Sequence, residues 1–260
     1  GISGSLGSDG GEFAGRLWAG RTTGVEAWRS GCYSPRPQKL ETESQALIRC
    51  ILFDLDGTLL DSYEPITESL NAARAAFGLG EFTREEVVRM VGHGLEQLMA
   101  QALGEHNVAE GVRIFRERYQ VVSLPKSRLL PGVEPTVREL SRRGYLMAIV
   151  TNKPAIFSRR ILQHLKVSEL FPVLYGPDLA PAKPNPEMVF RCLQDLGCES
   201  REAILVGDML VDQETARNAG IAFFAVATGS ESRENLLLAR PQRLLERFED
   251  LLVHLPALSR

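Results

Sequence analysis

From residue 48 onward, short runs of consecutive apolar residues alternate with longer stretches in which apolar residues recur every three or four positions. The short runs predict strands buried on both faces, and the periodic stretches predict amphipathic helices. Strict alternation of the two is typical of a parallel sheet covered by helices on both sides. The expected strands are residues 48–53, 146–150, 173–175, 203–206 and 221–226. The pattern therefore predicts a doubly wound, Rossmann-like α/β fold.

The helices between these strands carry clear end signals. They are expected at residues 133–143, 155–165, 186–196 and 212–219. Gly144, Gly197 and Gly220 follow three of them, as glycine commonly does after a helix, and each glycine leads into the next strand. Two further helices, around residues 232–238 and 247–254, are expected to complete the domain.

One interval interrupts the alternation, because the first strand ends at Asp54 and the next one begins only near Leu146. Residues 65–127 instead predict an all-helical cap domain, inserted into a catalytic core of residues 47–64 and 128–260. The cap helices are expected at 65–77, 83–90, 95–103 and 108–122, and Thr83 followed by Glu86 predicts a capping box. The crossings at 63–65 and 124–131 contain proline and polar residues, which suggests two hinge strands.

Residues 1–46 differ from the rest of the chain. Glycine, serine and arginine are frequent there, apolar periodicity is absent, and Pro35 and Pro37 interrupt any regular structure. This composition predicts a disordered N-terminal extension, and we exclude it from the fold. A transit peptide is the alternative, but acidic residues such as Asp9 and Glu12 argue against it.

Composition and charge argue against several classes of protein. With 260 residues, 44% of them apolar, the chain can bury a sizeable core. A net charge of −3 without a dense basic block argues against nucleic acid as a partner. No apolar stretch reaches the ~20 residues that cross a bilayer, and no secretory signal is evident. The four cysteines match neither a zinc motif nor a disulfide framework, which fits a cytoplasmic protein.

Two carboxylates follow the first predicted strand, in Asp54-Leu55-Asp56-Gly57-Thr58. Residues i and i+2 of an extended backbone point to the same side, so Asp54 and Asp56 are expected to converge. Such a pair suits phosphoryl transfer, in which one carboxylate attacks phosphorus and the other handles the proton of the leaving group. The alternative is an acidic turn that merely ends a strand.

Three more polar sites follow later strands, where ligands bind in open α/β sheets. Thr151 and Asn152 could hold a phosphate oxygen, although a simple helix cap is the better explanation of this segment taken alone. Lys183 lies next to Pro184, which fixes the backbone, although most lysines are simply solvated. Asp208 and Asp212 add two carboxylates, of which Asp212 could merely cap a helix. The four sites together point to one functional site, because they occur in order along the chain and each follows a predicted strand.

Together these motifs resemble those of the haloacid dehalogenase-like phosphatase superfamily, over about residues 48–255. The resemblance implies that the α/β core carries an inserted helical cap. It implies that Asp54 is the nucleophile and becomes an aspartyl phosphate. Asp56 would be the general acid and then the general base, while Thr151 and Lys183 would hold the phosphoryl oxygens.

The resemblance also implies a metal site, in which Asp208 binds Mg²⁺ with Asp54 and the backbone carbonyl of Asp56. Asp212 would support the metal shell or Lys183. Electrostatics lead in the same direction, since two unit charges ~4 Å apart repel by about 4 kcal/mol at an effective dielectric near 20. Hard oxygen ligands beside a phosphate favour Mg²⁺ over zinc or copper.

Within the superfamily, the details favour a phosphoglycolate phosphatase. Asp56 argues against a dehalogenase, and the absence of lysine from residues 65–125 argues against a phosphonatase. The segments 91–98, 150–154 and 229–233 resemble bacterial phosphoglycolate phosphatases, whereas Met209 departs from the serine that many relatives carry. Pyrophosphatases, other small-metabolite phosphatases and β-phosphoglucomutase remain alternatives.

The remaining predictions concern His93, a non-enzyme alternative and the binding partner. His93 is expected to contact the end of the substrate that carries no phosphate, and an exposed histidine in a turn is an equally good interpretation. A phospho-accepting receiver domain is the non-enzyme alternative, but it needs roughly half this length and has no helical insertion. The expected partner is a small phosphorylated metabolite, bound by a monomer or homodimer.

Overall fold

The fold is centred on a six-stranded, all-parallel sheet. The computed structural model describes residues 47–258, so the predicted disorder of residues 1–46 lies outside the described residues. The strand order is β5-β4-β1-β6-β7-β8. Their bounds are Cys50–Phe53 for β1, Leu146–Val150 for β4, Val173–Tyr175 for β5, Ala203–Gly207 for β6, Ala222–Val226 for β7 and Arg243–Leu245 for β8. The predicted Rossmann-like α/β fold is confirmed.

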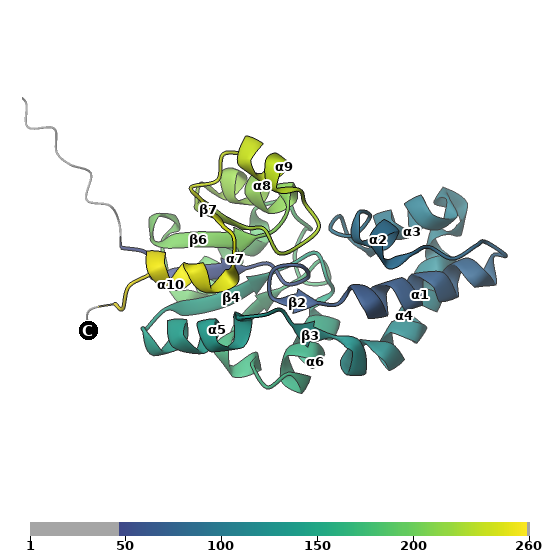
Figure 1. The fold of residues 1–260 in the computed structure, drawn as a ribbon, viewed down its shortest axis with the longest axis horizontal. Coiled ribbons are helices and arrows are strands. Elements are labelled where there is room, and N and C mark those ends of the chain that lie inside the picture. The colour runs from purple at the N-terminus through teal and green to yellow at the C-terminus, as the bar shows by residue number, and fades with distance from the viewer. Residues whose placement is uncertain (1–46, 259–260) are drawn as a thin grey trace, which may run out of the picture. The chain divides into compact units, whose positions relative to one another are not determined.

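Helices cover both faces of this sheet (Figure 1). Ile51 and Phe53 of β1 point into one apolar cluster, and Cys50 and Leu52 point into the other. The first face is covered by α5 (Val133–Arg142), α6 (Ala155–His164) and α10 (Leu251–His254). The second is covered by α7 (Glu187–Leu196), α8 (Leu210–Ala219) and α9 (Arg233–Leu238). Because both faces are covered, β1 is fully buried.

Four α-helices lie between the short strands β2 (Leu60–Asp61) and β3 (Arg128–Leu129) in sequence, and we call them the helical insertion. They are α1 (Tyr63–Ala76), α2 (Arg84–Val88), α3 (Leu95–Leu103) and α4 (Val108–Lys126). The two strands that flank the insertion, β2 and β3, pair antiparallel. The predicted capping box of Thr83 and Glu86 is present at the start of α2.

The structure corrects the bounds of the two predicted hinges, although β3 does lie within the predicted crossing at 124–131. Residues 63–65 form the first turn of α1 and not a crossing, since Pro65 can stand in a first turn whose N–H groups have no helical partner. Residues 124–126 extend α4 beyond its predicted end, where Lys126 pairs with Glu64 and Glu68 of α1. The two short strands β2 and β3 are the actual connections.

The edge strand β8 was not predicted. It has only three residues and begins with the exposed Arg243, so its sequence carries no apolar run. The last predicted helix is also shorter, because residues 248–250 form a 3₁₀ turn before α10. In the described part of the chain, no helix is long and apolar enough to cross a membrane.

Candidate active site

The residues singled out in the sequence gather at the carboxyl end of the sheet. Asp54 directly follows β1, and Thr151 and Asp208 directly follow β4 and β6, the two neighbours of β1. The strand order reverses direction at β1, and open α/β sheets bind ligands at such a point. Lys183 reaches the same place from the segment between β5 and α7.

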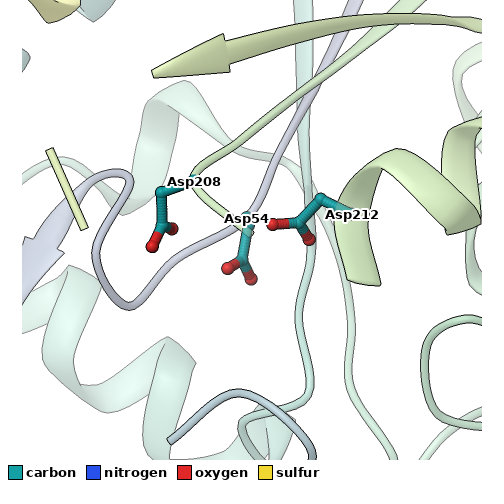
Figure 2. Close-up of side chains that lie close together, drawn as sticks. All are labelled: Asp54, Asp208 and Asp212. Atoms are coloured by element: carbon teal, nitrogen blue, oxygen red, sulfur yellow. The ribbon is translucent and has the colours of Figure 1, made fainter. Parts of the chain in front are cut away.

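Three carboxylates meet here, those of Asp54, Asp208 and Asp212 (Figure 2). One oxygen of each lies within 4.8 Å of the others, and all three residues are buried. Burial raises the pKa of Asp208 well above its ordinary value, and the charges of Asp54 and Asp212 add to this effect. Burial also raises the pKa of Asp212, to about 6, although Lys183 opposes the shift. Such a concentration of buried negative charge needs cations nearby.

Asp208 is held in place from several sides. The Thr58 hydroxyl donates to its Oδ1 at 2.7 Å, and the backbone N–H of Ser230 donates to its Oδ2 at 3.1 Å. Glycine is required on both sides, because a Cβ on Gly57 or Gly229 would lie 2.5 Å or 1.7 Å from Oδ2. The carboxylate is therefore tightly oriented, and the all-oxygen donor set of the cluster fits a hard divalent cation.

Lys183 supplies positive charge to the cluster. Its buried Nζ lies 2.7 Å from Oδ1 of Asp54 and 2.6 Å from Oδ1 of Asp212. Burial alone lowers the pKa of Lys183, but the charges of Asp212 and Asp54 outweigh burial and raise it. Lys183 is therefore an ammonium ion, and its expected contact with phosphoryl oxygens stays a prediction.

Asp56 faces a different partner. Its carboxylate lies outside the three-carboxylate cluster and accepts from Nζ of Lys153 at 2.9 and 3.1 Å, and from the hydroxyl of Ser62. No motif in the sequence points to a role for the charge of Lys153. Lys153 is 97 positions from Asp56 in the chain, so only the fold brings them together. The expected metal contact through the backbone carbonyl of Asp56 stays a prediction.

Comparison with known proteins identifies the family of this chain. A family model described as haloacid dehalogenase-like hydrolase matches residues 51–226, from the central strand β1 to the end of β7. The chain belongs to this family.

Individual relatives of this haloacid dehalogenase-like hydrolase cover most of its length. A phosphoglycolate phosphatase of Photorhabdus laumondii is 33% identical over 82% of this chain and 95% of its own. A 5'-nucleotidase of Pseudomonas aeruginosa is 32% identical over 74% of this chain and 88% of its own. The crystal structure of a predicted phosphoglycolate phosphatase from Haemophilus somnus 129pt has a TM-score of 0.75 and 28% identity, over 80% of this chain and 97% of that one.

In this hydrolase, a pocket opens between the carboxylates and the helical insertion. The sheet side contributes Asp54, Asp56, Thr151, Asn152, Lys153, Pro154, Phe157, Lys183 and Met209. The insertion contributes Ile66, Val91, Gly92, Gly94, Leu95, Leu98, Phe115 and Tyr119. A ligand in the pocket would thus meet charged groups on one side and a largely apolar wall on the other.

Thr151 and Asn152 differ in what they offer to a ligand. Both are buried at the pocket. The hydroxyl of Thr151 accepts from the N–H of Lys153 at 3.2 Å and can still donate. The amide of Asn152 is already engaged, since Nδ2 donates to Gly92 O at 3.0 Å and to Lys183 O at 3.3 Å, and Oδ1 accepts from Lys183 N at 2.8 Å. The Asn152 side chain therefore holds neighbouring segments in place, and the expected substrate contact of Asn152 stays a prediction.

His93 does not line the pocket in this structure, so its expected contact with the substrate stays a prediction. Its side chain is exposed, whereas the flanking Gly92 and Gly94 do line the pocket. Gly92 packs so closely on Met209 that a Cβ there would lie 2.3 Å from the methionine sulfur. The glycines, rather than the histidine, thus bring the insertion to the pocket, and both have the positive φ that glycine tolerates best.

Proposed function

We propose that this hydrolase is a metal-dependent phosphatase that converts 2-phosphoglycolate and water into glycolate and phosphate. The observation that carries the proposal is the buried Asp54 carboxylate, held by Lys183 beside Asp208 and facing a pocket that also contains Asp56. A nucleophile, a proton carrier and anion-binding groups are thereby present within one site.

The proposed first step transfers the phosphoryl group to Asp54. An oxygen of Asp54 forms a bond to phosphorus while the bond between phosphorus and the leaving oxygen breaks. Asp56, in its protonated form, gives its proton to that oxygen, which leaves as the hydroxyl of glycolate. Lys183 and Thr151 hold the phosphoryl oxygens, and their fixed positions stabilise the charge that develops there.

The second step releases phosphate. Asp56 now takes a proton from water, the water oxygen bonds to phosphorus, and the bond between Asp54 and phosphorus breaks. Asp212 keeps Lys183 in place through both steps. Mg²⁺, held by Asp54, Asp208 and the backbone carbonyl of Asp56, would supply the charge that lets a phosphate approach these carboxylates.

The helical insertion acts as a cap in this proposal. Residues 65–127 would close the pocket over the substrate and exclude water that is not needed for the reaction. We further propose a cytoplasmic location and a monomeric or homodimeric state. Free thiols at Cys50, Cys192 and Cys198, in the part of the chain that is described, support a reducing location.

The test is phosphate release in the presence of Mg²⁺ from 2-phosphoglycolate, 5'-AMP, pyrophosphate and β-glucose 1-phosphate. We expect the highest kcat/KM with 2-phosphoglycolate. Asp54→Asn should lower kcat at least about a thousandfold, because the nucleophile is lost. Asp195→Asn, on the surface, is the matched control.

Two results would count against the proposal in different ways. Full turnover by Asp54→Asn would refute the mechanism. A preference for 5'-AMP, the substrate type of the Pseudomonas relative, would leave the mechanism intact and change only the substrate.

A further inference from the structure

Lys153 places a buried positive charge beside Asp56 in the pocket. Its side chain is 6% exposed, and its Nζ lies 2.9 Å from Oδ2 of Asp56. Burial alone lowers the pKa of Lys153, but the charge of Asp56 is the main cause that raises it, so the side chain is an ammonium ion. A buried ammonium has three N–H donors and needs acceptors for them.

Tyr119 of α4 lies next to Lys153 and lines the same pocket. Its ring centroid is 4.8 Å from Nζ of Lys153. The ring stacks on Phe115 at 5.4 Å and meets Phe157 edge to face at 5.2 Å, so its position is fixed. The hydroxyl is buried and has no hydrogen-bond partner among the described residues. An unpaired buried hydroxyl is costly unless a ligand pairs with it.

The rest of this wall is apolar, formed by residues such as Ile66, Leu95 and Leu98. Asn152, the other polar residue nearby, has its amide engaged within the protein. Lys153 and Tyr119 are therefore the polar groups of the pocket that remain for the part of a substrate beyond its phosphate.

We infer that Lys153 and Tyr119 form a subsite for a carboxylate on the leaving group of the substrate. The inference rests on the proposed function, because it takes Asp56 to protonate the leaving oxygen. Atoms attached to that oxygen then lie beside Asp56 and within reach of Lys153. A carboxylate can accept from the ammonium and from the phenol hydroxyl together, whereas a nucleoside offers no anion at this point. The two residues thus select small phosphate esters of hydroxy acids.

The test compares 2-phosphoglycolate with its amide, 2-phosphoglycolamide, which has the same shape without the carboxylate charge. The readout is the ratio of the two kcat/KM values, so any general loss of activity cancels. We expect wild type to prefer the acid. Tyr119→Phe should lower the ratio about tenfold, as expected for one hydrogen bond to a charged group, and Lys153→Met should lower it further.

Matched controls separate selectivity from unrelated effects. Tyr175→Phe removes a surface hydroxyl that bonds to Asp195, and Lys126→Met removes an exposed ammonium that pairs with Glu64. Neither should change the ratio. A ratio that Tyr119→Phe and Lys153→Met leave unchanged would overturn the subsite, even if both variants lose activity.

Binding distinguishes failure of the subsite from failure of the proposed function. Calorimetry with Asp54→Asn and Mg²⁺ measures the affinity for the acid and the amide without turnover. Tighter binding of the acid, reduced by adding Tyr119→Phe, supports the subsite even if the wild-type enzyme hydrolyses neither ester. Equal binding of the two overturns the subsite, whether or not the enzyme is a phosphatase.

Discussion

At the scale of single residues, Gly229 is needed to leave room for the carboxylate of Asp208. A Cβ at this position would lie 1.7 Å from Oδ2 and 2.2 Å from Cγ of Asp208. Gly229→Ala should therefore displace the carboxylate and weaken Mg²⁺ binding at least about tenfold, as do other changes to groups that orient metal ligands. The Mg²⁺ dependence of phosphate release measures this. Gly80→Ala, where a Cβ has open space, is the control and should show wild-type dependence.

The raised pKa of Asp212 predicts how Mg²⁺ stabilises the protein at different pH. Between the ordinary value of 3.8 and the folded value of about 6, the folded protein without metal binds more protons here than the unfolded chain. This group's contribution to the free energy of unfolding therefore falls as pH rises through that window. Asp208 acts in the same direction. A divalent cation replaces these protons, so adding Mg²⁺ should raise the Tm of the protein more at pH 7 than at pH 5. Equal increases would contradict the assignment.

At the scale of elements, the Asn152 side chain joins the loop after β4 to the insertion and to the segment of Lys183. Asn152→Ala would remove its bonds to Gly92 O and Lys183 O and leave the N–H of Lys183 unpaired. We expect a loss of about 1–3 kcal/mol in the free energy of unfolding and faster hydrogen exchange around Gly92. Asn218→Ala, which removes an exposed bond to Pro184 O, should cost less. Unchanged exchange at Gly92 would show that the contact does not hold the insertion.

The predictability of each element followed from its local pattern. β1 and β4 could be predicted because all their residues are apolar and a polar residue follows each strand directly. β8 was not, since only Leu245 of its three residues is buried and pairing with β7 decides its conformation. The end of α4 was placed too early, because Pro125 normally stops a helix and contacts with α1 keep the last turn helical here. Tertiary contacts are not visible in a local pattern.

At the scale of the whole molecule, some site residues could be predicted from the sequence and others could not, because tertiary contacts bring the second group together. Asp54 and Asp208 could be predicted because each follows its own strand, and parallel strands end at one edge. Lys153 pairs with Asp56 across 97 positions, and Tyr119 joins them from the insertion. The way in which the insertion meets the sheet determines both contacts, and no single segment encodes it.

The architecture as a whole predicts that residues 1–46 can be removed. Ile48 is the first described residue that packs against the core, and Arg49 follows, pairing with Glu202 through its side chain and its backbone N–H. All proposed site residues lie between Asp54 and Asp212. A chain that starts at Leu47 should therefore keep kcat/KM within about twofold and Tm within a few degrees. A chain that starts at Phe53 is the contrast, because it lacks most of the central strand β1 and should not fold. Loss of activity in the first truncation, with Tm unchanged, would mean that the N-terminal residues contribute to the site itself.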